Sequence, residues 1–357
     1  MLRCDMIIRS RAPLRIGFFG GGTDIPPYSY EHGGKVLTAA INKYAYTTWQ
    51  ISDNKDLTVH SHDLNINTKV EDLVYDGKYD LIKATFKYLN LNKGGHFVLH
   101  SDAPVGSGLG TSSAVNVSLV GAIWDGSGKA AEKPFGMVKT RKEIADTAFK
   151  IEREELGIAG GYQDQYVAAF GGFNIIEMDK NKNVYVIPLK VPRDIQSELQ
   201  YSILLCDIKM PRMSGNLIAG QKKEYSEGKN LEIHHKLKEL VKPGMNALLN
   251  GDVKYFGELL HESWLVKKEI AKGTSNDYID AIYNAARETG AVYGGKISGA
   301  GGGGHMTLIC DPTRKVEVQK AIIKKALEFS AGTENVNNLV DFKTVSFDDK
   351  GLYVWRV

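Results

Sequence analysis

The chain has 357 residues, of which 43% are hydrophobic and 24% charged, a length and composition that favour two globular domains with sizeable cores. Its net charge of +3 is too small and too dispersed to indicate a nucleic-acid-binding surface, so we expect no nucleic-acid partner.

The beginning of the chain and its cysteines bear on where the protein works. The segment MLRCDMIIRSRAP has no apolar region of signal-peptide length, and no apolar run approaches the length of a membrane span. The cysteines Cys4, Cys206 and Cys310 are far apart and lack CxxC spacing, which disfavours both disulfides and a zinc site. These features predict a soluble cytoplasmic protein with no membrane partner. A monomer and a homodimer both remain open.

The first half of the chain mixes strands and helices. In chain order we expect strands at 6–19, 35–51 and 96–100, helices at 112–124 and 140–156, and two strands within 171–192. The strand at 35–51 is rich in β-branched and aromatic residues, and the helix at 140–156 has a clear helical period.

The second half is richer in long helical stretches. The expected elements are a strand at 201–208, helices at about 214–249, 252–272 and 276–289, a strand–loop–strand at 292–310, a helix at about 313–331, and a strand-rich tail. We place a domain boundary near 193–200, which gives a first domain of residues 1–195 and a second of residues 196–357.

The segment PVGSGLGTSSA at 104–114 combines glycines with a run of hydroxyls between a strand and a helix. Its glycines allow a close backbone approach to a ligand, and the start of the following helix attracts anions through its open N–H groups. The residues predicted to bind phosphate here are Gly106, Ser107, Gly108, Gly110, Thr111, Ser112 and Ser113.

Several interpretations of this glycine loop compete. A Walker A loop is excluded because the segment has no GK[ST]. A dinucleotide fold is disfavoured because the spacing is GxGxG, and because Asp125 falls at the end of a helix rather than a strand. A different nucleotide loop, whose hydroxyls reach Mg²⁺, and a simple tight turn both stay open.

Two further glycine-rich segments, RAPLRIGFFGGGTD at 11–24 and KISGAGGGGHM at 296–306, suggest one site assembled from both domains. With APLRIGFFGGGTD, PVGSGLGTSSA and KISGAGGGG in this order, the chain resembles the GHMP kinases over nearly its full length. The FGGGTD form resembles the heptose-phosphate kinase branch more than galactokinases or mevalonate kinases.

The resemblance implies a fold class and two ligands. It implies an α+β fold with an N-terminal domain like ribosomal protein S5 domain 2 and a ferredoxin-like C-terminal domain. The active site would lie in the cleft between them and use ATP and Mg²⁺.

Two carboxylates are candidates for the chemistry. On a helix, Glu152 falls on the apolar face and Arg153 points away from it, so Glu152 needs either an internal salt bridge or a cation such as Mg²⁺. Asp164 comes twelve positions later, after two glycines, where a helix cap or a turn is the alternative. The resemblance implies that Glu152 is the metal ligand, assisted by Ser112 or Ser113, and that Asp164 is the catalytic base.

The resemblance assigns further residues to catalysis and substrate binding. Arg15 would be the cation beside the catalytic base, although a surface arginine at a strand end is the alternative. Asp24 would bind sugar hydroxyls with help from Gly22 and Thr23, although an ordinary turn residue is the alternative. The run from Ser298 to Gly304 is expected to close over the substrate or phosphate region, although a flexible turn is the alternative. Its candidates for substrate binding are Ser298, Gly299, Ala300 and Gly301.

A substrate that already carries a phosphate needs a second cationic site. Lys209 and Arg212, next to a strand at the start of the second domain, are the candidates, although both can equally be solvated.

The resemblance implies ATP-dependent phosphorylation of the anomeric hydroxyl of D-glycero-D-manno-heptose 7-phosphate, which gives the 1,7-bisphosphate. A kinase of the same family acting on L-fucose or another alcohol is the alternative. A regulator that binds ATP and sugar without catalysis is a third hypothesis, and an RNA-binding module, suggested by the S5-like fold, is a fourth that the weak charge excess disfavours.

Overall fold

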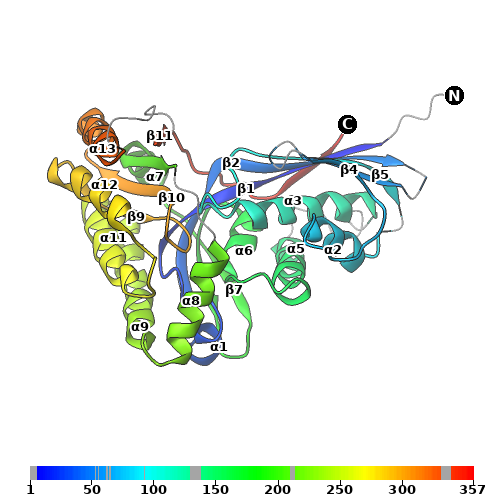
Figure 1. Ribbon diagram of the computed structural model, residues 1–357, viewed down its shortest axis with the longest axis horizontal. Coiled ribbons are helices and arrows are strands. Elements are labelled where there is room, and N and C mark those ends of the chain that lie inside the picture. The colour runs from blue at the N-terminus through cyan, green and yellow to red at the C-terminus, as the bar shows by residue number, and fades with distance from the viewer. Residues whose placement is uncertain are drawn as a thin grey trace.

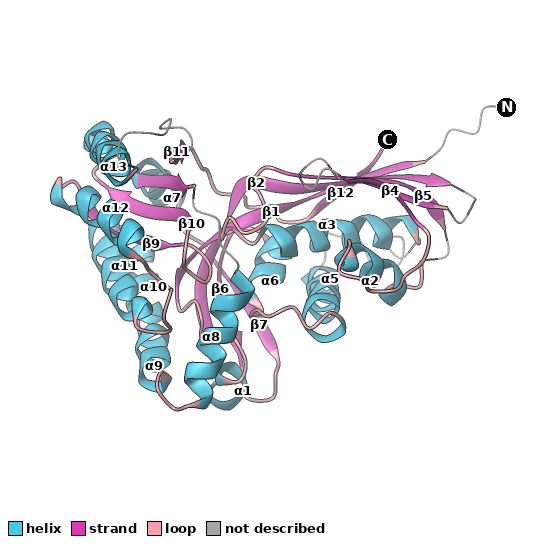
Figure 2. Cartoon of the chain, in the orientation of Figure 1, coloured by secondary structure: helices cyan, strands magenta, loops and turns pink. Residues whose placement is uncertain are grey.

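The structure, a computed structural model, describes residues 6–52, 54, 56–61, 63, 66–91, 93–128, 138–209, 214–330 and 339–357. Within these residues the chain forms one eight-stranded and one four-stranded sheet, each covered by helices (Figures 1 and 2). The two sheets lie in different parts of the molecule and meet near the middle of the view.

The larger sheet is built on two long antiparallel strands, β1 (Ile7–Phe19) and β2 (Gly34–Ser52). Its strand order is β12-β1-β2-β5-β3-β4, and β2 also pairs with β6, which pairs with β7. The other strands are β3 (Leu57–Ser61), β4 (Ile66–Val70), β5 (Gly94–Ser101), β6 (Phe173–Met178), β7 (Val184–Leu189) and β12 (Tyr353–Arg356). The β-branched and aromatic residues of β2 suit a strand that is paired along its whole length.

Helices cover one face of the larger sheet (Figure 2). They are α2 (Asp80–Tyr88), α3 (Thr111–Gly126), α5 (Val138–Phe149) and α6 (Gln163–Phe170), while the short α1 (Tyr28–His32) follows β1. α3 is buried on nearly all sides because it contacts the sheet as well as α2, α5 and α6. A helix that is apolar all round is the expected result of such a position.

The predicted helix at 140–156 is interrupted near the site. α5 ends at Phe149, and residues Lys150–Glu155 form a π-helical turn. A π-turn inserts an extra residue per turn, so side chains after it point in directions that a regular helix does not allow.

The smaller sheet is antiparallel, with the order β11-β8-β10-β9. Its strands are β8 (Ile203–Ile208), β9 (Val292–Ile297), β10 (Gly304–Cys310) and β11 (Val340–Lys343). The helices of this part are α7 (Arg193–Ser202), α8 (Ser214–Ser226), α9 (Leu231–Glu239), α10 (Val241–Leu249), α11 (Val253–Lys268), α12 (Asp277–Glu288) and α13 (Lys315–Phe329), with a 3-10 turn at Pro312–Arg314. Trp264, Ile282 and Leu308 belong to its buried apolar core.

The two parts are joined by more than the chain connection. Phe18 and Phe19 at the end of β1 pack edge-on against Phe256 of α11, with ring centroids 5.1 and 5.2 Å apart. The last strand, β12, pairs with β1, and its Arg356 forms an ion pair of 2.7 Å with Asp125. Because β12 pairs with β1, we propose that residues 353–356 belong with the first domain. The predicted boundary between residues 195 and 196 falls within α7.

Candidate active site

A cavity of about 190 Å³ lies where the two parts meet. Its lining comes from the end of β1 and the turn after it, the glycine loop, the start of α3, the π-turn, the segment 158–164, α8, α11 and residues 299–300. Residues from all three glycine-rich segments therefore face one space, as the sequence predicted for a site assembled from both domains.

The glycine loop turns sharply into α3. Gly106, Gly108 and Gly110 have φ angles of +87°, +83° and +79°, in the left-handed region that glycine tolerates best. A Cβ on Gly110 would lie 3.4 Å from Cγ of Asp164, so a side chain here would crowd the carboxylate. Because Gly110 is the N-cap of α3 and has no side chain, it leaves the first N–H groups of the helix to bind an anion.

The glycine loop is also attached to the second part of the molecule. The Ser107 carbonyl accepts a hydrogen bond of 3.0 Å from the His305 N–H of β10 and lies 3.0 Å from its Nδ1. The Ser107 hydroxyl lies 3.0 Å from that of Thr111. Ser107 therefore supports the loop rather than facing the cavity, whereas Thr111 is among the lining residues.

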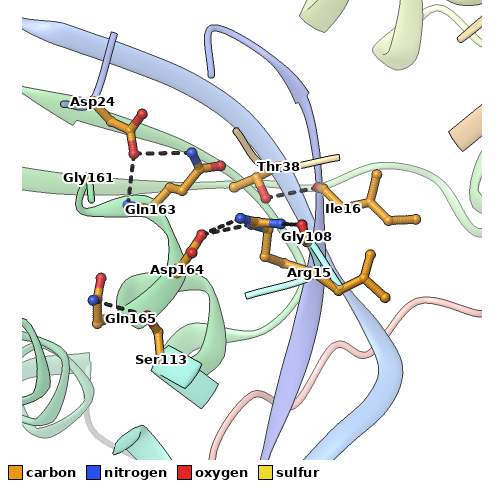
Figure 3. A network of polar contacts seen from close by, with 12 residues as sticks. Arg15, Ile16, Asp24, Thr38, Gly108, Ser113, Gly161, Gln163, Asp164 and Gln165 are labelled. Carbon is orange, nitrogen blue, oxygen red and sulfur yellow. Dashed lines mark hydrogen bonds and ion pairs between the residues drawn. The ribbon is translucent and has the colours of Figure 1, made fainter. Parts of the chain in front are cut away.

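Arg15 and Asp164 form a close ion pair at the cavity (Figure 3). Nε and Nη2 of Arg15 each lie 2.7 Å from Oδ1 of Asp164, and Nη1 donates to the Gly108 carbonyl. Arg15 is only 4% exposed, so the alternative of a surface arginine is wrong. Asp164 lies in the first turn of α6, where Tyr162 is the N-cap, and its side chain is 21% exposed.

Glu152 is fully buried at 0% exposure, yet it is among the residues that line the cavity. Its Oε1 accepts a hydrogen bond of 3.2 Å from Ser112, and its Oε2 accepts one of 2.8 Å from Ser113 and another from the Gln165 amide. Nη2 of Arg153 lies 3.7 Å from Oε2. The expectation that Arg153 points away was wrong, because the π-turn replaces the regular helix that it assumed.

Asp24 is a buried carboxylate in the glycine turn that follows β1. Its Oδ1 accepts from the Gly22 N–H at 3.1 Å, and its Oδ2 accepts from Nε2 of Gln163 at 3.1 Å (Figure 3). A Cβ on Gly161 would lie 2.0 Å from Oδ2, so this glycine makes room for the carboxylate. Gly22 and Asp24 line the cavity, but the Thr23 hydroxyl lies 2.8 Å from the Gly20 carbonyl, away from the lining.

The third glycine segment contributes only in part. Gly299 and Ala300 line the cavity. The Ser298 hydroxyl lies 3.2 Å from that of Thr307 within the smaller sheet, and Gly301 packs so closely that a Cβ would lie 2.5 Å from the Thr274 carbonyl.

Of the two cations predicted for a remote phosphate, Lys209 is described by the structure and does not line the cavity. Nζ of Lys209 forms an ion pair of 2.8 Å with Asp207, and Lys209 is absent from the residues that line the cavity. Arg212 lies outside the described residues.

The comparisons with known proteins agree on a family. The model of the GHMP kinases N terminal domain matches residues 79–172, and that of the GHMP kinases C terminal domain matches residues 245–328. The chain is 36% identical to the D-glycero-alpha-D-manno-heptose 7-phosphate kinase of Campylobacter jejuni, over 98% of this chain and 99% of the relative. The chain belongs to the GHMP kinase family.

Two other similarities are informative for this GHMP kinase. A solved structure, a D-glycero-D-manno-heptose 1-phosphate kinase from Bacteroides thetaiotaomicron, superposes with a TM-score of 0.76 at 33% identity and covers 98% of this chain and 99% of its own. The bifunctional fucokinase/GDP-fucose pyrophosphorylase of Arabidopsis thaliana is 26% identical over 90% of this chain, which spans 32% of that longer protein.

Family membership confirms several predictions together. The two-domain GHMP kinase fold of the α+β class is confirmed, and so is the prediction of an ATP-dependent phosphotransferase.

Among the helices of the described residues, none has the length and apolar character needed to cross a membrane.

Sequence reasoning missed two lysines beside the site. Lys267 of α11 lines the cavity, and Lys296 of β9 lies next to it. Burial lowers the pKa of the Lys296 ammonium well below its usual value, and the charges of Lys267 and Arg15 lower it further. A signal was present: Lys267 follows Trp264 by three residues on the buried face of α11, and Lys296 interrupts an apolar strand.

Proposed function

We propose that this GHMP kinase transfers the γ-phosphoryl group of ATP to the anomeric hydroxyl of a heptose 7-phosphate, giving ADP and the 1,7-bisphosphate. The Arg15–Asp164 pair beside the glycine loop carries the proposal, since it joins a proton acceptor to an anion-binding helix start in one cavity. The heptose is supported by the two relatives at 36% and 33% identity, both of which are named as heptose phosphate kinases.

Asp164 acts as the general base in this proposal. The two Arg15 nitrogens that contact Asp164, Nε and Nη2, both lie at Oδ1, so we assign Oδ2 to the proton of the sugar hydroxyl. As that proton passes to the carboxylate, the hydroxyl oxygen forms its bond to the γ-phosphorus and the bond from the γ-phosphorus to the bridging oxygen of ADP breaks. Arg15 offsets the charge that gathers near the carboxylate and holds Asp164 in position.

The phosphates of ATP fit the side of the cavity formed by the glycine loop and the start of α3. The N–H groups of Gly108, Gly110 and the first turn of α3 provide donors there, and glycine at these positions lets the phosphates approach the backbone.

The donor set around Glu152 fits Mg²⁺. A buried carboxylate at the cavity with two serine hydroxyls beside it suits an ion that takes one or two carboxylates and completes its shell with phosphate oxygens and water. When bound, Mg²⁺ would offset the charge of the transferring phosphoryl group. Glu152, with Ser112 and Ser113, would hold it, and Gln165 keeps the carboxylate oriented toward the serines.

The sugar fits the part of the cavity that lies next to Asp24. Its carboxylate can accept hydrogen bonds from sugar hydroxyls, and Gln163 holds it in place. Gly21 and Gly22 in the lining keep side chains out of the space that a sugar ring needs. Because the reaction uses ATP and a metabolic sugar phosphate, we place the protein in the cytoplasm, as a monomer or a homodimer.

A fucokinase is the second candidate, favoured by the similarity to the plant fucokinase over 90% of this chain. The experiment that tests the proposal is ³¹P NMR of the products formed from ATP and D-glycero-D-manno-heptose 7-phosphate. We expect a new phosphate signal coupled to the anomeric proton while the original phosphoester remains. A new phosphoester at any other carbon, or no product, contradicts the proposal.

A further inference from the structure

Two lysines of the second domain lie at the sugar side of the cavity, where Lys267 of α11 lines it and Lys296 of β9 lies next to it. Their elements, α11 and β9, are neighbours in the fold (Figure 1). Both side chains are 3% exposed. Nζ of Lys267 donates to the Gly299 carbonyl at 2.6 Å, and Nζ of Lys296 donates to the Phe18 carbonyl at 3.2 Å. Each ammonium is thus held by a backbone carbonyl next to a glycine-rich segment.

The two ammonium groups converge on Gly21. A Cβ built on Gly21 would lie 3.4 Å from Nζ of Lys267 and 3.9 Å from Nζ of Lys296. Gly21 lines the cavity, so the absence of a side chain leaves a small space bounded by two lysine amino groups.

Two like charges close together in a buried place are costly unless an anion compensates them. Among the carboxylates of the described residues, Asp24 is the one whose charge favours a protonated Lys296, and it forms no ion pair with it. Burial and the charge of Lys267 lower the pKa of Lys296, and a dianionic ligand between the lysines would reverse that change. The arrangement is therefore suited to a bound phosphate.

We propose that Lys267 and Lys296 bind the phosphate group that the sugar substrate already carries. This inference rests on the proposed function and places the remote phosphate at these two lysines instead of at Lys209. The position favours the sugar phosphate over the phosphates of ATP, because Gly21 belongs to the same turn as the sugar-binding Asp24. The glycine loop, which we assign to ATP, is a separate segment of the lining.

The test compares Lys267→Met and Lys296→Met with Lys268→Met. Lys268 is the matched control, because it adjoins Lys267 on α11 but forms an ion pair of 3.2 Å with Asp280. Loss of a charge-assisted hydrogen bond should raise the KM for heptose 7-phosphate by about 10- to 100-fold in the first two variants. The KM for ATP should stay within about twofold, Lys267→Arg should recover part of the loss, and Lys268→Met should behave as wild type.

A binding measurement separates this inference from the choice of sugar. With a non-hydrolysable ATP analogue bound, inorganic phosphate is titrated calorimetrically into wild type and Lys267→Met at pH 8 in Tris and in Hepes. We expect phosphate to bind the wild type with uptake of a proton, and to bind the variant at least tenfold more weakly. This result is independent of which sugar the enzyme accepts, and folding of each variant is checked by thermal unfolding.

Each contrary outcome has its own meaning. An increased KM for ATP with an unchanged KM for the sugar would assign the lysines to the nucleotide and overturn the inference. An equal increase in the KM for heptose without its phosphate would assign the two lysines to sugar hydroxyls and overturn the inference. A larger increase in the KM for heptose 7-phosphate in Lys209→Met would assign the phosphate to Lys209 and also overturn it. Wild type that binds phosphate but phosphorylates no heptose 7-phosphate would refute the proposed function and leave the anion site standing.

Discussion

Replacement of Asp164 by asparagine is the sharpest perturbation of the proposed chemistry. Asparagine keeps the shape of the side chain, and its amide oxygen can still accept the two 2.7 Å contacts from Nε and Nη2 of Arg15. It cannot accept a proton at pH 7. The change therefore removes the base while leaving most of the local geometry in place.

The magnitude follows from the role of the base. General-base catalysis contributes about 10²–10⁴-fold, so we expect Asp164→Asn to lower kcat by that factor, or about 3–5 kcal/mol in activation free energy. The glycine loop is untouched, so the affinity for ATP should change by less than about threefold. Since Arg15 is buried and loses its anionic partner, stability should fall by about 1–3 kcal/mol.

The assay is coupled ADP release at saturating substrates, with ATP affinity measured separately by a fluorescent analogue. Asp280→Asn is the control, because Asp280 also pairs with a cation, Lys268, but lies outside the cavity lining. An Asp164→Asn enzyme that keeps more than about a tenth of wild-type kcat would refute the base assignment. A parallel loss of ATP affinity would indicate that the ion pair acts through structure alone.

Three further predictions concern other parts of the site. Glu152→Gln should raise the Mg²⁺ concentration needed for half-maximal activity by at least about tenfold, because the charged ligand is lost; an unchanged Mg²⁺ titration would leave Glu152 with a structural role only. Gly161→Ala should raise the KM for the sugar about tenfold without changing that for ATP, because its Cβ would lie 2.0 Å from Oδ2 of Asp24; equal KM values in mutant and wild type would exclude that Asp24 binds the sugar. Burial lowers the pKa of His305 in the folded state. As the pH falls below about 6.5, the unfolded state therefore takes up a proton at this residue before the folded state does. His305 then reduces the free energy of unfolding by at most about 1.4 kcal/mol per pH unit. The free energy of unfolding, measured with urea, should therefore fall less steeply between pH 7.5 and 5.5 in His305→Gln than in wild type. Identical slopes in the two proteins would refute this.

Local patterns explain what the sequence predicted well. The glycine spacing of 104–114 depends on backbone freedom and on the helix that follows, both of which are local, and the strands at 6–19 and 35–51 appear as β1 and β2. The sequence did not decide whether Ser112 or Ser113 assists Glu152. In the structure each of the two hydroxyls donates to a different oxygen of Glu152.

Other features of the fold and the site were not predicted from these patterns. The pairing of β12 with β1 joins segments more than 300 residues apart and has no local pattern. The neighbours of Arg153 depend on a π-turn that breaks the helical period. Lys209 was assigned to a phosphate by its position near a strand, but the neighbouring Asp207 forms an ion pair with it.

The measurement that tests the central claim most directly is coupled ADP release with ATP and Mg²⁺ across D-glycero-D-manno-heptose 7-phosphate, sedoheptulose 7-phosphate, L-fucose, galactose and mevalonate. We expect turnover with the heptose 7-phosphate at a kcat/KM at least 100-fold above that of any other acceptor. Preferred turnover of L-fucose would contradict the assigned substrate, and no turnover of any acceptor would contradict a catalytic role for the cavity.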